Sequence, residues 1–156
     1  MDTFTRAIHG RLRGEDMTGE QYMNNIGKVR REIRLLMEQI ERDTILASGV
    51  KAIRYDLDKV QTSPSDRMPD IVATITITTD KLYKRIEELQ QLEESARSLL
   101  LQLRAEHERV LVMRYFDEMS WENIAEKIGY NDKYIFELKD RALNELTQIL
   151  QSSDSI

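Results

Sequence analysis

The stretch SWENIAEKIGYNDKYIFELKDR, from Ser120 to Arg141, constrains the fold more than any other part of the chain. It predicts a short helix, a turn at Gly129 and a second helix, which is the layout of a helix-turn-helix. Gly129 can take the positive φ that such a turn requires without steric strain. Ala125 is small enough to let the two helix backbones approach each other, and Ile135 is placed to pack back on the first helix.

Capping residues and apolar spacing support the same interpretation. Ser120 can cap the first helix, and Asn131 or Asp132 can cap the second. The buried face continues at helical spacing through Ile124, Ile128 and Leu138. A pair of helices that only pack together would show a similar pattern, but the combination of cap, small residue and glycine favours a DNA-binding motif.

The residues before Ser120 extend the pattern, and the longer segment resembles a known protein family. Residues 108–120 predict another helix, with a core side formed by Val110, Leu111, Met113 and Tyr115 or Phe116. The segment ERVLVMRYFDEMSWENIAEKIGYNDKYIFELKDRAL resembles region 4 of bacterial sigma factors. The whole chain is similar to small phage transcription regulators of the ArpU and RinA type, and VQTSPSDRMPDIVATI (residues 60–75) resembles the linker of that group. The resemblance covers most of residues 20–150 and implies activation of phage late or packaging genes.

The predicted fold class is all-α, with a long helical hairpin or coiled coil followed by a helix-turn-helix domain. Six glycines and two prolines in 156 residues leave few helix breaks. We expect a loosely ordered N-terminus over 1–18, a hairpin over 19–105 with a connector at 49–69, the helix-turn-helix over 106–150 and a tail over 151–156.

Two long helices are expected in the hairpin, one from Gly19 to Ser48 that Gly49 ends, and one from Asp70 to Leu103. Apolar residues recur every seven positions in both, at Ile26, Ile33, Ile40 and Ala47, and at Leu82, Leu89, Ala96 and Leu103. Either one hairpin buries both rows, or the rows pair in a homo-oligomer, since two helices alone form a thin core. The β-branched residues 71–79 locally prefer strand, but we expect helix because a long helical pattern follows.

Charge argues against simple DNA binding. Residues 107–156 hold six Lys or Arg against ten Asp or Glu, a formal net charge of −4. DNA-binding domains usually present a basic surface, because neutralising phosphates supplies much of the non-specific affinity. Sigma-like recognition helices also tend to carry more Arg and Lys than this one. Binding that depends on a dimer or on RNA polymerase stays open, and the basic cluster 28–34 either contacts such a partner or is a solvated helix face.

If the motif binds double-stranded DNA, its second helix enters the major groove. The residues expected at the interface are Asn131, Lys133, Tyr134, Glu137, Lys139, Arg141 and Lys127. Asn131 suits adenine, Lys133 suits guanine or a phosphate, and Arg141 and Lys127 suit the backbone. Each has an alternative: Asn131 only caps the helix, Tyr134 packs in the core, and the lysines are ordinary solvated charges. The sole tryptophan, Trp121, is expected to pack rather than to contact DNA.

The sequence contains no motif for metal binding or catalysis. His9 and His107 lie in no metal-ligand spacing, and the chain has no cysteine, phosphate-binding glycine loop or nucleophile elbow. We therefore expect no catalysis, metal or cofactor. No stretch approaches about 18 uninterrupted apolar residues, so we expect no membrane span. The expected location is the cytoplasm of a bacterial host cell.

The sequence favours a sequence-specific transcription regulator that binds a promoter and contacts RNA polymerase. One alternative is a DNA-recognition subunit of the small-terminase kind, which also joins a helix-turn-helix to oligomerising helices. Another is a protein-interaction module that kept the fold and lost DNA affinity, as the acidic C-terminal domain allows.

Overall fold

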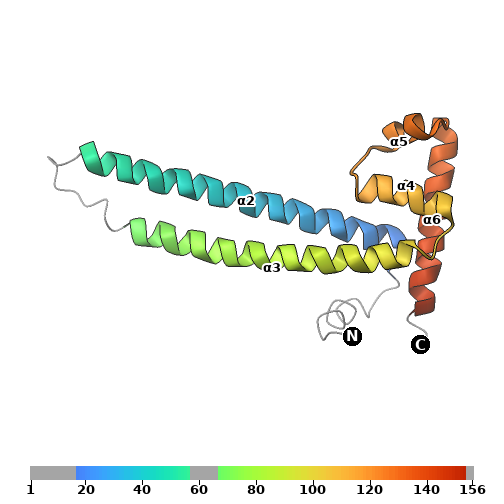
Figure 1. Ribbon diagram of the computed structural model, residues 1–156, viewed down its shortest axis with the longest axis horizontal. Coiled ribbons are helices and arrows are strands. Elements are labelled where there is room, and N and C mark those ends of the chain that lie inside the picture. The colour runs from blue at the N-terminus through green and yellow to red at the C-terminus, as the bar shows by residue number, and fades with distance from the viewer. Residues whose placement is uncertain (1–16, 57–66, 154–156) are drawn as a thin grey trace. The chain divides into compact units, whose positions relative to one another are not determined.

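The computed structural model describes residues 17–56 and 67–153. For residues 50–56 it describes the backbone only. These parts form α-helices and no strand, which confirms the all-α prediction (Figure 1). The helices are α2 (Gly19–Asp56), α3 (Met68–Leu100), α4 (Ala105–Tyr115), α5 (Trp121–Ile128) and α6 (Asp132–Ser153). The expected loose N-terminus up to residue 16, the connector over 57–66 and the tail from residue 154 lie outside the described residues.

The chain forms two compact units whose boundaries differ from the expected division at residue 105. One unit comprises residues 29–89, the greater part of the α2–α3 hairpin. The other combines α4, α5 and α6 with residues 17–28 and the last turns of α3 from residue 90. This compact unit extends beyond residues 106–150, because the helix ends that carry Met23 and Leu100 are buried in its core.

The core of this C-terminal unit draws on all of its helices. α2 contributes Met23 and Ile26, and α3 contributes Leu92, Ala96 and Leu100. The remaining buried apolar side chains come from α4 to α6 and the turn before them: Leu103, Val110, Leu111, Met113, Trp121, Ile124, Ala125, Ile135, Leu138, Ala142, Leu143 and Leu146. The core positions expected for α4 at Val110, Leu111 and Met113 are confirmed, and Tyr115 and Phe116 are half-buried.

The start of α2 lies against α6 at unusually short range. A Cβ added at Gly19 would lie 2.7 Å from the Leu143 carbonyl oxygen and 3.0 Å from the Leu146 Cβ. The Gly19 amide donates a hydrogen bond to the Thr147 hydroxyl at 2.8 Å. Glycine is required here because no other residue fits between the two backbones.

The structure corrects the expected end of α2 and shows the conformation of residues 71–79. Gly49 does not end α2, which continues to Asp56. A single glycine costs about 1 kcal/mol in a helix interior, which the helix-forming residues on both sides of it can offset. The β-branched residues 71–79 are helical, and the hydroxyls of Thr74, Thr76 and Thr79 donate to the carbonyl oxygens four residues earlier.

The glycine contacts of α2 give a matched test of the α2–α6 packing. Gly19→Ala should lower the free energy of unfolding by about 1–3 kcal/mol, because the new methyl group meets a backbone oxygen that cannot move freely. Gly27→Ala should raise it by up to about 1 kcal/mol, since alanine favours helix and nothing lies within 4 Å of the added Cβ. Denaturant unfolding of both variants measures the difference, and equal stabilities would contradict the close approach.

Candidate nucleic-acid interface

The turn between α5 and α6 has the geometry that the sequence predicts. The Ser120 hydroxyl accepts a hydrogen bond from the Asn123 amide at 3.2 Å and so caps α5. Gly129 has φ +84°, in the left-handed region, and its amide and that of Tyr130 both donate to the Ala125 carbonyl oxygen at 2.9 Å. This closure satisfies the last turn of α5 and reverses the chain into α6.

Of the two residues expected to cap α6, Asn131 or Asp132, the structure shows Asn131 as the cap. Its Oδ1 accepts from the Tyr134 amide at 2.8 Å. An N-cap side chain uses its oxygen for this bond and leaves its NH₂ group directed elsewhere. The capping role therefore does not remove the amide donors of Asn131 from the exposed surface.

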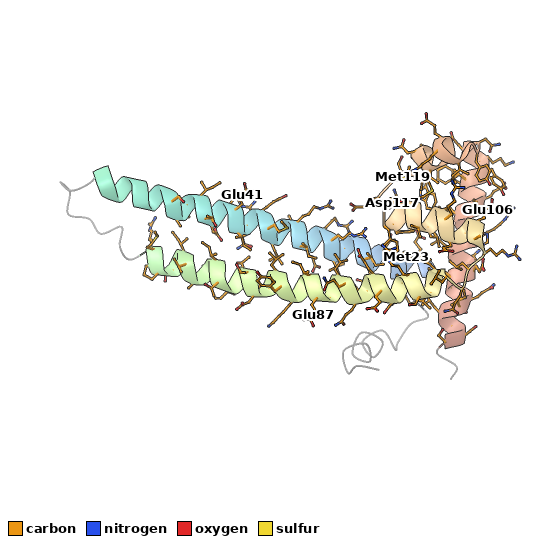
Figure 2. All side chains as sticks on the ribbon, in the orientation of Figure 1. Met23, Glu41, Glu87, Glu106, Asp117 and Met119 are labelled. Atoms are coloured by element: carbon orange, nitrogen blue, oxygen red, sulfur yellow. The ribbon has the colours of Figure 1, made fainter. Side chains whose placement is uncertain are left out.

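Two tyrosines at the start of α6 share one carboxylate of α4. The hydroxyls of Tyr130 and Tyr134 donate to Glu106 Oε1 at 2.9 Å and 3.2 Å, and the two rings meet edge to face with centroids 4.7 Å apart. Figure 2 labels Glu106 on α4, close to α6. The hydrogen bond to Glu106 raises the pKa of both phenols above the ordinary value, with burial a smaller cause. Tyr134 is thus engaged with α4 and lies outside the buried core.

A second set of contacts surrounds Trp121, which is buried as expected. The Lys139 Nζ lies 5.7 Å from the centroid of a Trp121 ring, and the Arg114 guanidinium lies 5.8 Å from it. Arg114 also donates to the Met119 carbonyl oxygen at 2.9 Å. Lys139, predicted at the DNA interface, therefore lies over the indole and joins α6 to α5.

The remaining predicted residues are Lys133, Glu137 and Arg141 on α6 and Lys127 on α5. Arg141 and Glu137 form an ion pair one turn apart, with 3.8 Å between Nη2 and Oε2. Lys133 and Lys127 are exposed, and no hydrogen bond or ion pair within the described part of the chain involves either. Of the seven predicted residues, these two lysines are the cations that remain available to a ligand.

Phe136 is a surface residue that the sequence analysis missed. It is 42% exposed on α6, three residues after Lys133 and therefore on a neighbouring part of the helix surface. Helical spacing could have predicted its exposure, because Phe136 lies between the buried positions Ile135 and Leu138 and cannot share their face. An exposed aromatic ring on the outward side of this helix is a candidate contact.

The surface around these residues is predominantly acidic. Its exposed carboxylates outnumber the basic side chains Lys127, Lys133 and Arg141, and they are Glu122, Glu126, Asp132, Glu137 and Asp140. The structure therefore does not separate the acidic residues from the predicted contact side.

α6 is also held to the start of α4 by a side-chain contact that no sequence signal indicated. Glu145 Oε2 contacts Nδ1 of the buried His107, and Glu145 Oε1 accepts from the Arg104 amide at 3.1 Å. The carboxylate therefore caps α4 from another helix. His107 appeared isolated because its partner lies 38 residues later in the sequence.

Comparisons of the chain with protein-family models, with curated proteins and with solved structures gave no match. Within residues 17–56 and 67–153, no cluster of three or more potential ligands could hold a metal ion. In the same residues, no helix combines the length and the apolar character that crossing a membrane requires.

The shared carboxylate predicts a change in tyrosine titration. Glu106→Gln removes the charge and should lower the pKa of Tyr130 and Tyr134 toward the usual value of about 10. Because the folded-state pKa is raised, the stabilisation by Glu106 is present below pH about 10 and is lost as pH rises through the folded pKa. Tyrosine-labelled NMR titration measures the shifts, with Glu122→Gln as the control. Unchanged values in Glu106→Gln would contradict the contact.

Close packing of α5 on α6 predicts a cost for enlarging Ala125, which is buried. Ala125→Leu should lower the free energy of unfolding by about 1–3 kcal/mol, because a larger side chain at a buried position overpacks the core. Ala105→Leu, at an exposed position in the first turn of α4, is the matched control and should change it little. Thermal unfolding of both variants tests this, and an unchanged transition in Ala125→Leu would contradict the close contact.

Proposed function

We propose that the chain is a sequence-specific DNA-binding transcription regulator that inserts α6 into the major groove. The observation that carries the proposal is the α5–Gly129–α6 unit, in which both helices are capped and the outward side of α6 takes no part in the core. A helix of this kind presents its early exposed residues to base edges when it docks in the groove.

The available side chains assign specific contacts. Lys133 would reach a guanine or a phosphate, and Lys127 would bind the backbone beside the groove. The free amide of Asn131 would donate to a base, and Phe136 would pack on a thymine methyl group. Glu137 would accept from a cytosine amino group once it leaves Arg141, which would favour particular sequences rather than DNA in general.

The acidic surroundings predict weak autonomous binding. Few cations face a duplex here, so few counterions would be released and the non-specific affinity would be low. A partner that already lies on the promoter would offset this weakness. We propose RNA polymerase as that partner and phage late or packaging genes as the targets, on the resemblance to sigma region 4 and to the phage regulators.

A protein-interaction module is the second candidate. The observation that favours it is that exposed Phe136 lies on α6 among the exposed carboxylates of Asp132, Glu137 and Asp140, which suits a basic protein surface with an apolar pocket. In this case the helix-turn-helix would serve as a rigid scaffold, and duplex DNA would be repelled.

DNA selection separates the two candidates. Purified full-length protein should enrich one discrete sequence from a random duplex library, and from phage genomic fragments, at physiological salt. Enrichment of a fragment upstream of a gene cluster supports the regulator, whereas a fragment at the packaging start supports the small-terminase alternative. Binding that disappears between low and physiological salt, or that never occurs even with added RNA polymerase, would contradict the proposal.

Point variants test the assigned contacts on the selected sequence. Lys133→Ala should weaken binding by roughly 5- to 150-fold, the range of one good base contact of about 1–3 kcal/mol. Asn131→Asp should change the preferred base while keeping the α6 cap, since aspartate caps as well as asparagine does. Lys81→Ala, at an exposed position in α3, is the control. Wild-type affinity and specificity in the first two variants would show that α6 does not read the DNA.

A further inference from the structure

One stretch of α2 carries a positive charge in an otherwise acidic chain. Residues 21–37 hold four Lys or Arg against one Glu, a formal net charge of +3, whereas the whole chain has a net charge of −5. The one carboxylate, Glu32, is balanced by a residue of α3, since Arg85 Nε lies 3.1 Å from Glu32 Oε2. The cations of this part of α2 are therefore left in excess.

Three of these cations share the exposed side of α2, and we call Lys28, Arg31 and Arg34 the basic row. All three are exposed, and no hydrogen bond or ion pair within residues 17–56 and 67–153 involves any of them. At about 100° per residue, Lys28 and Arg34 lie about 60° to either side of Arg31, and the buried Val29 lies about 160° from it. Because α2 is one continuous helix, its geometry alone centres the basic row opposite the buried side.

Other arginines of the two long helices have carboxylate partners. Arg85 contacts Glu88 of its own helix as well as the carboxylate of α2. Glu38 follows Arg34 by one turn, but its Oε2 lies 3.9 Å from Arg42 Nη1. The basic row therefore differs from these arginines, because its three cations remain available to an anion outside the chain.

Gly27 lies within the same side of α2, about 40° around the helix from Arg31. Nothing lies within 4 Å of a Cβ added at Gly27, so the packing of the chain does not require glycine there. Glycine in a helix interior costs about 1 kcal/mol relative to alanine. A missing side chain is useful where the backbone of a ligand approaches closely. Gly27 therefore gives a polymer that binds the basic row room to approach α2.

We propose that the basic row binds the phosphate backbone of duplex DNA, as a contact additional to that of α6. Guanidinium groups match phosphate oxygens through paired hydrogen bonds, and Lys28 adds a compact charge. The row rises about 9 Å along α2, at about 1.5 Å per residue, while a duplex carries one charge per about 1.7 Å of its axis. Several phosphates are therefore within reach of the three cations.

An acidic protein surface fits the basic row less well than a duplex does. Protein interfaces are centred on apolar and aromatic side chains, whereas the centre of this row is Arg31 beside Gly27. The inference rests on the proposed function in one respect, namely that the protein binds duplex DNA. It adds a source of the affinity that the acidic surroundings of α6 lack.

The salt dependence of binding to a mixed-sequence DNA duplex tests the proposal in the full chain. Arg31→Ala combined with Arg34→Ala should reduce the slope of log affinity against log salt concentration by about 2, since each neutralised phosphate contributes about 0.9. Lys81→Ala combined with Lys84→Ala is the matched control, because it removes two exposed cations from α3 and should change the slope little. Circular dichroism establishes that each variant keeps its helices.

The outcomes separate this inference from the proposed function. Equal reductions in both double variants would show an effect of net charge alone and would overturn the basic row as a site. A wild-type slope in the α2 variant would also overturn it, while duplex binding and the proposed function would stand. If that variant instead loses RNA polymerase, the row binds an acidic protein surface. A wild type that binds no duplex even at low salt would overturn both proposals.

Gly27→Ala tests the close approach of the DNA backbone, because its expected effects on stability and on binding have opposite signs. Alanine should stabilise α2, yet the new methyl group should reduce the affinity for the same duplex. Gly49→Ala is the matched control, since nothing lies within 4 Å of its added Cβ and Gly49 lies at the same angle around α2 but about 27 Å beyond Arg31. Undiminished affinity in Gly27→Ala, or an equal loss in the control, would overturn the close approach.

Discussion

Packing against α6 is the constraint on which the C-terminal unit depends. This helix buries Ile135, Leu138 and Leu146 almost completely. α4 and α5 pack on it, and α2 begins so close to it that only glycine fits at residue 19. Two further interactions hold it in place: Glu145 caps α4, and Lys139 lies over Trp121 of α5. A helix fixed on several sides can present its remaining side as a rigid surface, which recognition of a fixed partner requires.

Much of this unit could be predicted from the sequence because its signals are local. The Ser120 cap, the turn at Gly129 and the buried row through Ile135 follow from the conformational preferences of neighbouring residues. The all-α class follows from long apolar periodicity with few helix breaks. Helix also prevails over the strand preference of residues 71–79, because the rest of a 33-residue helix continues through them.

The individual roles of the predicted interface residues could not be obtained in this way, because they depend on contacts between distant segments. Tyr134 is engaged by Glu106, which lies 28 residues earlier in the chain. Lys139 lies over the indole of Trp121, on another helix. Periodicity places both residues on α6 but does not reveal what approaches them. Gly49 illustrates the opposite error, where a local helix-breaking preference was weaker than the helical tendency around it.

Pairing of two copies of the chain, the oligomeric alternative for the heptad rows of the hairpin, would address the weakness of the acidic interface. One helix-turn-helix with Lys133 on α6 and Lys127 on α5 available offers little affinity, since few phosphates are neutralised. Two linked recognition helices make the second binding event intramolecular, which can raise overall affinity by about 10²–10⁴ without any new contact. The gain requires an operator with two half-sites at a spacing that both helices reach at once. On this argument the acidic residues around α6 suppress binding at single sites, so the pair of sites, rather than one strong contact, would determine where the protein binds.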